Sequence, residues 1–154
     1  PMSARRQRQM CIRDRKEGGK VLLGGKRAAN FNKGYYYEPT IFDNIKDNFT
    51  IMKEEPFGPI VPILSFKDFD EVMKRANDNE LGLASYVYTT DLKKANQASE
   101  KLETGCVAVN TPVVAVAEAP FGGIKQTGYG REGGSMAIKD YLNIKYTHFG
   151  ISYE

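Results

Sequence analysis

The sequence predicts an α/β protein built around a parallel sheet. Short apolar runs alternate with helical patterns, and the links between them are tight, which is typical of strands joined by right-handed helical crossovers. The chain has 154 residues, of which 41% are hydrophobic, and this suits one globular domain.

Residues before 54 are predicted to contain two extended segments and a short helix. Val21–Leu23 is an apolar strand, and residues 35–42 (YYYEPTIF) are aromatic and β-branched, as strands are. Pro39 makes the second segment an edge strand or splits it, because proline lacks the amide that a central strand needs. Residues 47–53 are predicted to form the helix.

The middle of the chain has the most regular pattern. It predicts, in order, a strand at 60–66, a helix at 68–76, a strand at 83–89, a helix at 92–102 and a strand at 106–110. Asp68 and Glu71 form a capping box at the start of the first helix. Apolar residues follow from Phe69 at i, i+3, i+4 and i+7, which marks a buried helical stripe.

After Asn110 the sequence is irregular as far as about Glu132. A long loop at the carboxyl end of a strand is usually functional, because open α/β sheets bind ligands there. A last helix is predicted near residues 134–142, followed by an extended segment at 143–151 for which the sequence offers no partner strand.

The first fifteen residues carry five arginines and one acid, and show no helical or strand periodicity. They could be a basic arm that contacts phosphates or a disordered end. We favour a third interpretation, a cloning or sequencing scar, because residues 10–15 (MCIRDR) resemble the translation of a transposon end used in sequencing-library preparation. Residues 1–15 are therefore treated as a non-native or disordered tail.

Charge and composition argue against two classes of protein. Outside the tail the chain has 17 basic and 18 acidic residues, so we expect no nucleic-acid partner. It has no run of 18 apolar residues, so we expect no membrane partner. Two cysteines, Cys11 and Cys106, are too few for a disulfide framework and indicate a cytoplasmic location.

Three candidate sites are assigned structural roles. Gly128, Gly130 and Gly133 match G-x-G-x-x-G, but the preceding residues read as loop rather than as the strand that a dinucleotide fingerprint needs. Cys106 lies in a buried strand pattern, so a structural cysteine is favoured over a nucleophile. His148, the one histidine, is assigned to the surface or an interface, and no residue spacing suits a metal.

Residues 54–59 (EEPFGP) leave two interpretations open. A carboxylate at a loop-to-strand junction can accept hydrogen bonds from both hydroxyls of a ribose, and an aromatic two residues later points the same way in extended backbone. Glu55 and Phe57 could therefore hold a sugar. The alternative, which spacing alone favours, is a surface acid pair followed by a core phenylalanine.

From about Lys16 to Ile151 the chain resembles the C-terminal section of the aldehyde dehydrogenase superfamily. The resemblance rests on five motifs in matching order and spacing: GYYYEPTIF (34–42), KEEPFGPI (53–60), RANDNELGLASYVYTTD (75–91), TGCVAVN (104–110) and APFGGIKQTGYGREGG (119–134). The ending is most similar to the branch that oxidises succinate semialdehyde. The resemblance implies a three-layer catalytic domain whose C-terminal part is residues 16–142, with an oligomerisation strand and C-terminus at 143–154.

The resemblance also implies a mechanism for the whole enzyme. A cysteine thiolate attacks the aldehyde, hydride passes to NAD or NADP, and a glutamate activates water. We expect the nucleophile, that glutamate and the dinucleotide-binding domain upstream of this sequence. The chain alone is therefore expected to hold no catalytic residue and to be inactive.

Four positions match residues with roles in the family. Glu55 matches the glutamate that holds the nicotinamide ribose, and Phe57 the aromatic beside it, which favours the sugar-binding interpretation. Phe121 matches an aromatic of the aldehyde pocket. Ala115 stands where the succinate-semialdehyde branch has a carboxylate-binding serine and other members an aromatic, which implies a wider or more apolar pocket.

The expected partners are a small-molecule aldehyde, the N-terminal part of the same enzyme, and further copies of the chain bound through residues 143–151. An alternative function is a stand-alone, non-catalytic module that binds partners through the same strand. A basic nucleic-acid binder that uses residues 1–15 ranks last.

Overall fold

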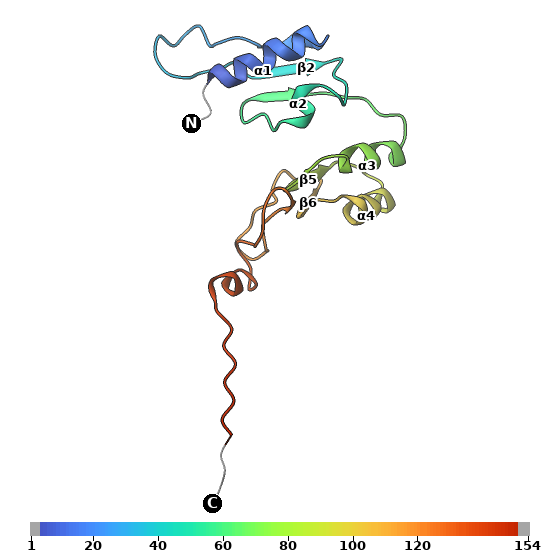
Figure 1. Ribbon diagram of the computed structural model, residues 1–154. Coiled ribbons are helices and arrows are strands. Elements are labelled where there is room, and N and C mark those ends of the chain that lie inside the picture. The colour runs from blue at the N-terminus through green and yellow to red at the C-terminus, as the bar shows by residue number, and fades with distance from the viewer. Residues whose placement is uncertain (1–3, 151–154) are drawn as a thin grey trace, which may run out of the picture. The chain divides into compact units, whose positions relative to one another are not determined.

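The computed structural model describes residues 4–150, which divide after Arg75 into two compact units (Figure 1). Unit 1 runs to Arg75 and unit 2 begins at Ala76. None of the helices in this described range is long and apolar enough to span a lipid bilayer.

Unit 1 is built on a three-stranded sheet. Its elements are α1 (Ala4–Lys16), β1 (Lys20–Leu23), β2 (Thr40–Asp43), α2 (Thr50–Lys53) and β3 (Ile60–Pro62), and the strand order is β1-β2-β3. β2 pairs parallel with β3, as an α/β sheet predicts, and antiparallel with β1, which the sequence analysis did not foresee. Strand β2 begins directly after Pro39 and is the central strand, so of the two alternatives for residues 35–42 the split at this proline is confirmed and the edge strand is wrong.

One face of this sheet forms the core of unit 1. Phe42 and Ile60 are buried on neighbouring strands, whereas Val61, one residue further along β3, is exposed. Successive side chains of a strand point to opposite faces, so this alternation means that only one face is covered. The core residues of the covered side are Cys11, Tyr37, Phe42, Ile45, Phe49, Ile51 and Ile60.

The expectation of no regular structure in residues 1–15 is wrong, because Ala4–Lys16 forms helix α1. Cys11 and Asp14 face the core and are buried, although they carry no apolar helical pattern with their neighbours. The pKa of the Cys11 thiol is raised, because the effect of burial is larger than that of a hydrogen bond with Tyr37, which lowers this pKa. Tertiary packing, rather than periodicity, therefore decides this helix.

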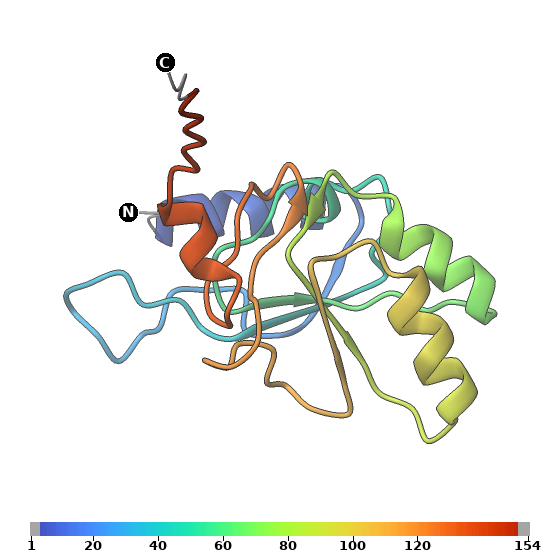
Figure 2. The ribbon, with the colours of Figure 1, turned by 90° about the horizontal axis from the view of Figure 1, so that it is seen from below.

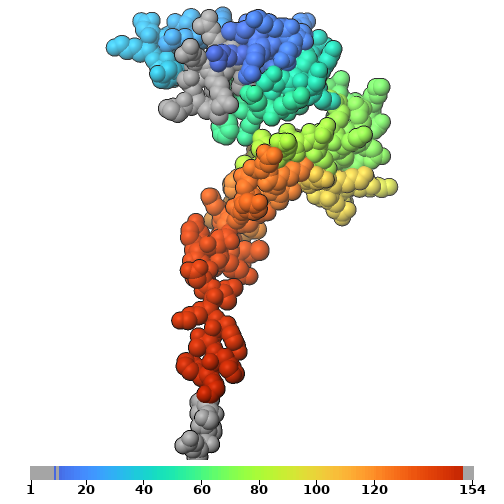
Figure 3. Space-filling view, viewed as in Figure 1, coloured from blue at the N-terminus to red at the C-terminus, as the bar shows by residue number. Residues whose placement is uncertain are grey.

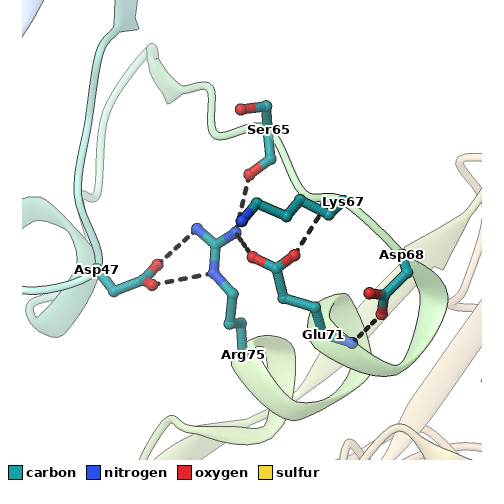
Figure 4. A network of polar contacts seen from close by, with 6 residues as sticks. All are labelled: Asp47, Ser65, Lys67, Asp68, Glu71 and Arg75. Atoms are coloured by element: carbon teal, nitrogen blue, oxygen red, sulfur yellow. Dashed lines mark hydrogen bonds and ion pairs between the residues drawn. The ribbon is translucent and has the colours of Figure 1, made fainter.

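Helix α3 (Phe69–Asn77) begins where the sequence predicts. The Asp68 carboxylate accepts a hydrogen bond from the Glu71 amide at 2.9 Å, while the Glu71 carboxylate accepts from the Lys67 amide at 2.8 Å (Figure 4). This arrangement differs from a capping box in one respect: the Glu71 carboxylate accepts from the Lys67 amide rather than from the amide of Asp68 itself. Arg75 anchors the same helix through the Ser65 carbonyl at 2.8 Å and the Asp47 carboxylate.

Unit 2 contains a parallel strand pair with a helical crossover (Figures 1 and 2). Its elements after α3 are β4 (Leu81–Gly82), β5 (Ala84–Val87), α4 (Leu92–Lys101), β6 (Cys106–Val109), β7 (Ile124–Lys125) and η1, a 3-10 helix (Ala137–Tyr141). β5 precedes α4 and β6 follows it in the sequence, and the two strands pair parallel, which confirms the strand–helix–strand unit predicted for this part of the chain. β4 and β7 form a short antiparallel pair within the loop expected to be irregular.

The last predicted helix is shorter than expected. Gly133 and Gly134 have φ values of 72° and 61°, which a right-handed helix cannot include, so η1 begins only at Ala137. Residues 143–150 then form no regular secondary structure, and their side chains are exposed (Figure 3). Residue 151, the end of the predicted extended segment, lies outside the described residues.

Candidate functional site

Glu55 and Phe57 lie on the turn between α2 and β3. The Phe57 amide donates to the Glu55 carbonyl at 3.1 Å, which closes a three-residue turn over Pro56. The expectation of extended backbone is therefore wrong here. The two residues are joined by a turn instead of by strand alternation.

Hydrogen bonds fix both ends of this turn within unit 1. On the α2 side, the Glu17 carboxylate accepts from the Thr50 amide at 3.2 Å and from its hydroxyl at 3.1 Å. On the β3 side, the Thr40 amide donates to the Pro59 carbonyl at 2.8 Å. The segment between them is thus carried by the sheet and its helix, and not by a free loop.

The two adjacent carboxylates differ in their contacts. Glu54 lies 3.4 Å from Arg13 in an ion pair, whereas the exposed Glu55 carboxylate makes no hydrogen bond or ion pair with those residues whose side chains the structure describes. The Phe57 ring is 59% exposed, so the alternative of a core phenylalanine is wrong in this chain. An open carboxylate beside an exposed ring can accept two sugar hydroxyls while the ring packs on the sugar.

Phe121 lies in unit 2, on the wall of a pocket of about 410 Å3. It exchanges two backbone hydrogen bonds with Glu132, both 2.7 Å long. Arg131 donates through its guanidinium to the carbonyls of Gly123 at 2.9 Å and Gly130 at 2.7 Å, and its amide donates to the Asp140 carboxylate at 2.8 Å. These bonds join the two arms of the loop that carries Phe121.

Ala115 does not line this pocket. It is exposed in residues 111–118, the connection that leaves β6, which we call the β6 exit loop. Ala115 and Phe121 were predicted to share one pocket, but of the two only Phe121 lines this cavity. Glu55 and Phe57 belong to unit 1, so the residues predicted to bind the cofactor and those predicted to bind the substrate are carried by different units.

The glycine motif at 128–133 has no dinucleotide-binding geometry. The short strand β7 precedes it, but no helix begins at its glycines. The motif therefore lacks the helix N-terminus that binds the phosphates of a dinucleotide. Gly133 meets a different need, because a Cβ at this position would lie 2.7 Å from the Ala119 carbonyl oxygen.

Cys106 and His148 show the contacts of structural residues. The Cys106 thiol is half-buried on β6, and its hydrogen bond is a long one, 3.9 Å, to the Gly122 carbonyl. The His148 ring is exposed, with Nδ1 3.3 Å from the Tyr146 hydroxyl. Within residues 4–150 no group of three histidine, cysteine or acidic residues could hold a metal ion.

Two polar residues near these sites were missed by the sequence analysis. Arg131 lies inside the G-x-G-x-x-G match and was given no role, and Asn110 was predicted only as the end of a strand. The available signal for Asn110 was an asparagine directly after β-branched strand residues, a position where a left-handed backbone is common. Nothing in the local sequence indicated the carbonyl partners of Arg131.

Comparison with known proteins gives one consistent result. A family model described as the aldehyde dehydrogenase family matches residues 2–147. The chain is 48% identical over 139 residues to the cytosolic 10-formyltetrahydrofolate dehydrogenase of Xenopus tropicalis, covering 89% of this chain and 15% of that protein. It is 44% identical over 135 residues to the NADP(+) succinate-semialdehyde dehydrogenase of Escherichia coli, covering 88% and 28%.

Solved structures show the same likeness. An aldehyde dehydrogenase from Bacillus cereus superposes with a TM-score of 0.88 at 43% identity, covering 92% of this chain and 28% of that chain. A succinate-semialdehyde dehydrogenase from Burkholderia pseudomallei gives 0.88 at 38% identity, covering 94% and 30%. The chain thus spans less than a third of the length of each of these proteins.

Proposed function

Because this chain belongs to the aldehyde dehydrogenase family, we propose that it is the C-terminal part of an NAD(P)-dependent enzyme that oxidises an aldehyde to its carboxylate. The lengths of the matching segments support this: the match to the B. cereus enzyme covers 92% of this chain but only 28% of that enzyme's chain. On this proposal the chain supplies cofactor and substrate contacts, and the reacting groups come from the rest of the enzyme.

The observation that carries the proposal is the open carboxylate of Glu55 beside the exposed ring of Phe57. A carboxylate without an internal partner can hold both hydroxyls of the nicotinamide ribose, and the ring limits how that end of the cofactor can turn. Bound NAD or NADP accepts the hydride that leaves the aldehyde. The related Bacillus cereus aldehyde dehydrogenase has been solved as an NAD+ complex, and the related Escherichia coli succinate-semialdehyde dehydrogenase is named for NADP(+), so either cofactor is proposed.

For the substrate we propose an aldehyde of the semialdehyde type, bound beside Phe121. The proteins similar to this chain include succinate-semialdehyde and glutarate-semialdehyde dehydrogenases. Ala115 offers no hydroxyl to a substrate carboxylate, so we propose a pocket with a wider or more apolar distal end than succinate semialdehyde requires.

Two protein partners are proposed from exposed apolar surface. Val61 and Leu22 on the uncovered face of the unit 1 sheet are where the N-terminal part of the enzyme would pack. Ile144 and Tyr146 are exposed in residues 143–150, whose backbone amides make no hydrogen bond within the described range. Such a segment can add as a strand to another copy of the chain.

The same exposed segment supports a second candidate, a non-catalytic interaction module. The two candidates differ in one assay, the formation of NADH or NADPH from a panel of aldehydes by the full-length protein that carries this chain. We expect turnover by the full-length protein and none by this chain alone. Absence of turnover by a folded full-length protein with either cofactor would leave the module as the better account.

A further inference from the structure

Asn110 closes the parallel pair β5–β6 with its side chain. The Asn110 amide donates to the Val87 carbonyl at 2.8 Å, which is the last backbone bond of the pair. Beyond it, Asn110 Oδ1 accepts from the Thr89 amide and Asn110 Nδ2 donates to the Thr89 carbonyl, both at 2.9 Å. The side-chain amide thus repeats the donor and acceptor of a peptide group and adds one more rung to the ladder.

This rung lets the main chain leave the sheet. Asn110 has φ of 55°, in the left-handed region that asparagine adopts more readily than most residues. The backbone therefore turns away from β5 at Asn110 while the side chain keeps the strand ends joined. The β6 exit loop therefore begins at a residue whose side chain stays bonded to the sheet.

The far end of the β6 exit loop is held by the glycine motif. The Gly134 amide donates to the Ala117 carbonyl at 2.8 Å. A Cβ on Gly133 would lie 2.7 Å from the Ala119 carbonyl oxygen and 3.3 Å from those of Ala117 and Val116, and its φ of 72° also disfavours other residues. The absence of a side chain at Gly133 allows the loop carbonyls to approach.

We propose that Asn110 and Gly133 are positioning residues that hold the β6 exit loop from its two ends and so determine which aldehydes the enzyme prefers. The loop carries Ala115 at its exposed middle, and the Gly133 end adjoins the Phe121–Glu132 pairing that shapes the pocket wall. The inference rests on the proposed function, because it assigns Ala115 to the substrate side. Neither residue touches the reacting atoms.

The test is Asn110→Gly in the full-length protein. Glycine adopts the left-handed backbone without strain but loses both bonds to Thr89, so the fold is kept while the loop is released. The matched control is Asn44→Gly in unit 1. Asn44 also has a left-handed backbone (φ 57°) and a side-chain hydrogen bond, 3.1 Å to the Gly18 carbonyl.

We expect Asn110→Gly to change the ratio of kcat/KM between two aldehydes of different distal ends by about tenfold, with KM for the cofactor within about twofold of wild type. Asn44→Gly should leave the ratio unchanged. Gly133→Ala should shift the ratio in the same sense as Asn110→Gly. An equal loss of activity toward all aldehydes, or no change in the ratio, would overturn the proposal.

Hydrogen exchange gives an independent readout. In Asn110→Gly, but not in Asn44→Gly, the Thr89 amide and the β6 exit loop should exchange faster, because their hydrogen bonds open more often. If the wild-type protein oxidises no aldehyde, the proposed function fails, and this measurement alone decides whether Asn110 holds the loop. Unchanged exchange at Thr89 and residues 111–118 would contradict that role.

Discussion

Arg75 binds Asp47 through two parallel hydrogen bonds, with Nε 2.9 Å from Oδ2 and Nη2 2.9 Å from Oδ1 (Figure 4). The pair joins helix α3 to the segment between β2 and α2, 28 residues earlier in the chain. The hydrogen bond to Asp47 is also the main reason that the pKa of Arg75 is raised. A planar guanidinium is needed for this two-bond geometry.

Replacement of Arg75 by lysine should therefore destabilise unit 1, although the charge is kept. We expect Arg75→Lys and Asp47→Asn each to lower the Tm, and the double variant to be little worse than either one, because both remove the same interaction. Thermal unfolding of the four proteins measures this. Strictly additive effects would show that the two residues act separately.

A buried carboxylate in α1 should make unit 1 less stable at neutral than at acid pH. Asp14 is 0% exposed, and neither carboxylate oxygen accepts a hydrogen bond of ordinary geometry. Burial raises its pKa, and the Ile51 amide lowers it by less. The protonated form favours folding, so its contribution is full below about pH 3.9, the pKa of an unfolded aspartate, and is lost as pH rises through the folded pKa.

Asp14→Asn should then increase the free energy of unfolding at pH 7 by on the order of 1 kcal/mol, with little gain at pH 4. Urea unfolding at the two pH values checks this. Asp43→Asn is the control, because Asp43 is exposed and its bond from the Asn44 amide can be kept by asparagine. An equal gain at both pH values would mean that burial of the charge is not the cause.

Glu55 and Glu54 provide a matched pair for the cofactor site. In the full-length protein, Glu55→Gln should raise KM for the cofactor about tenfold, since charge-assisted hydrogen bonds to the ribose are lost. Glu54→Gln removes a neighbouring charge that is already paired with Arg13, and should leave this KM within about twofold. Steady-state kinetics with varied cofactor distinguish the two. An equal rise in KM for the cofactor in both variants would mean that the negative charge of the turn as a whole, and not a direct bond from Glu55, binds the cofactor.

The serine that is absent at position 115 can be restored. Ala115→Ser should raise kcat/KM for succinate semialdehyde relative to an apolar aldehyde by about fivefold to tenfold, because a hydroxyl can bond the substrate carboxylate. Ala117→Ser in the same loop is the control, since it adds a hydroxyl two residues away. If both variants, or neither, shift the preference, Ala115 is not in contact with the substrate.

Local rules predicted the elements whose signals are local. Helix α4 follows from apolar spacing and ends before Gly105, and α3 begins at the Asp68 cap. The antiparallel pairing of β1 with β2 and the Arg75–Asp47 pair join residues more than fifteen positions apart, and a single sequence carries no pattern for such contacts. Helix α1 was missed because its buried face includes the charged residue Asp14 beside Cys11, so no apolar stripe marks it.

The sites divide in the same way. The position of Glu55 and Phe57 at a junction before a strand was foreseen, but the turn over Pro56 that joins them was not, because a proline is compatible with extended backbone as well. Asn110 and Gly133 act through carbonyls of other segments, so their roles become visible only once those segments are placed.

The central claim is that this chain is the C-terminal part of a larger aldehyde dehydrogenase. Sequencing the source genome upstream of the codon for Lys16 tests it most directly. We expect an open frame that runs back through a cysteine-nucleophile motif and a dinucleotide-binding domain. A stop codon in that frame would contradict it.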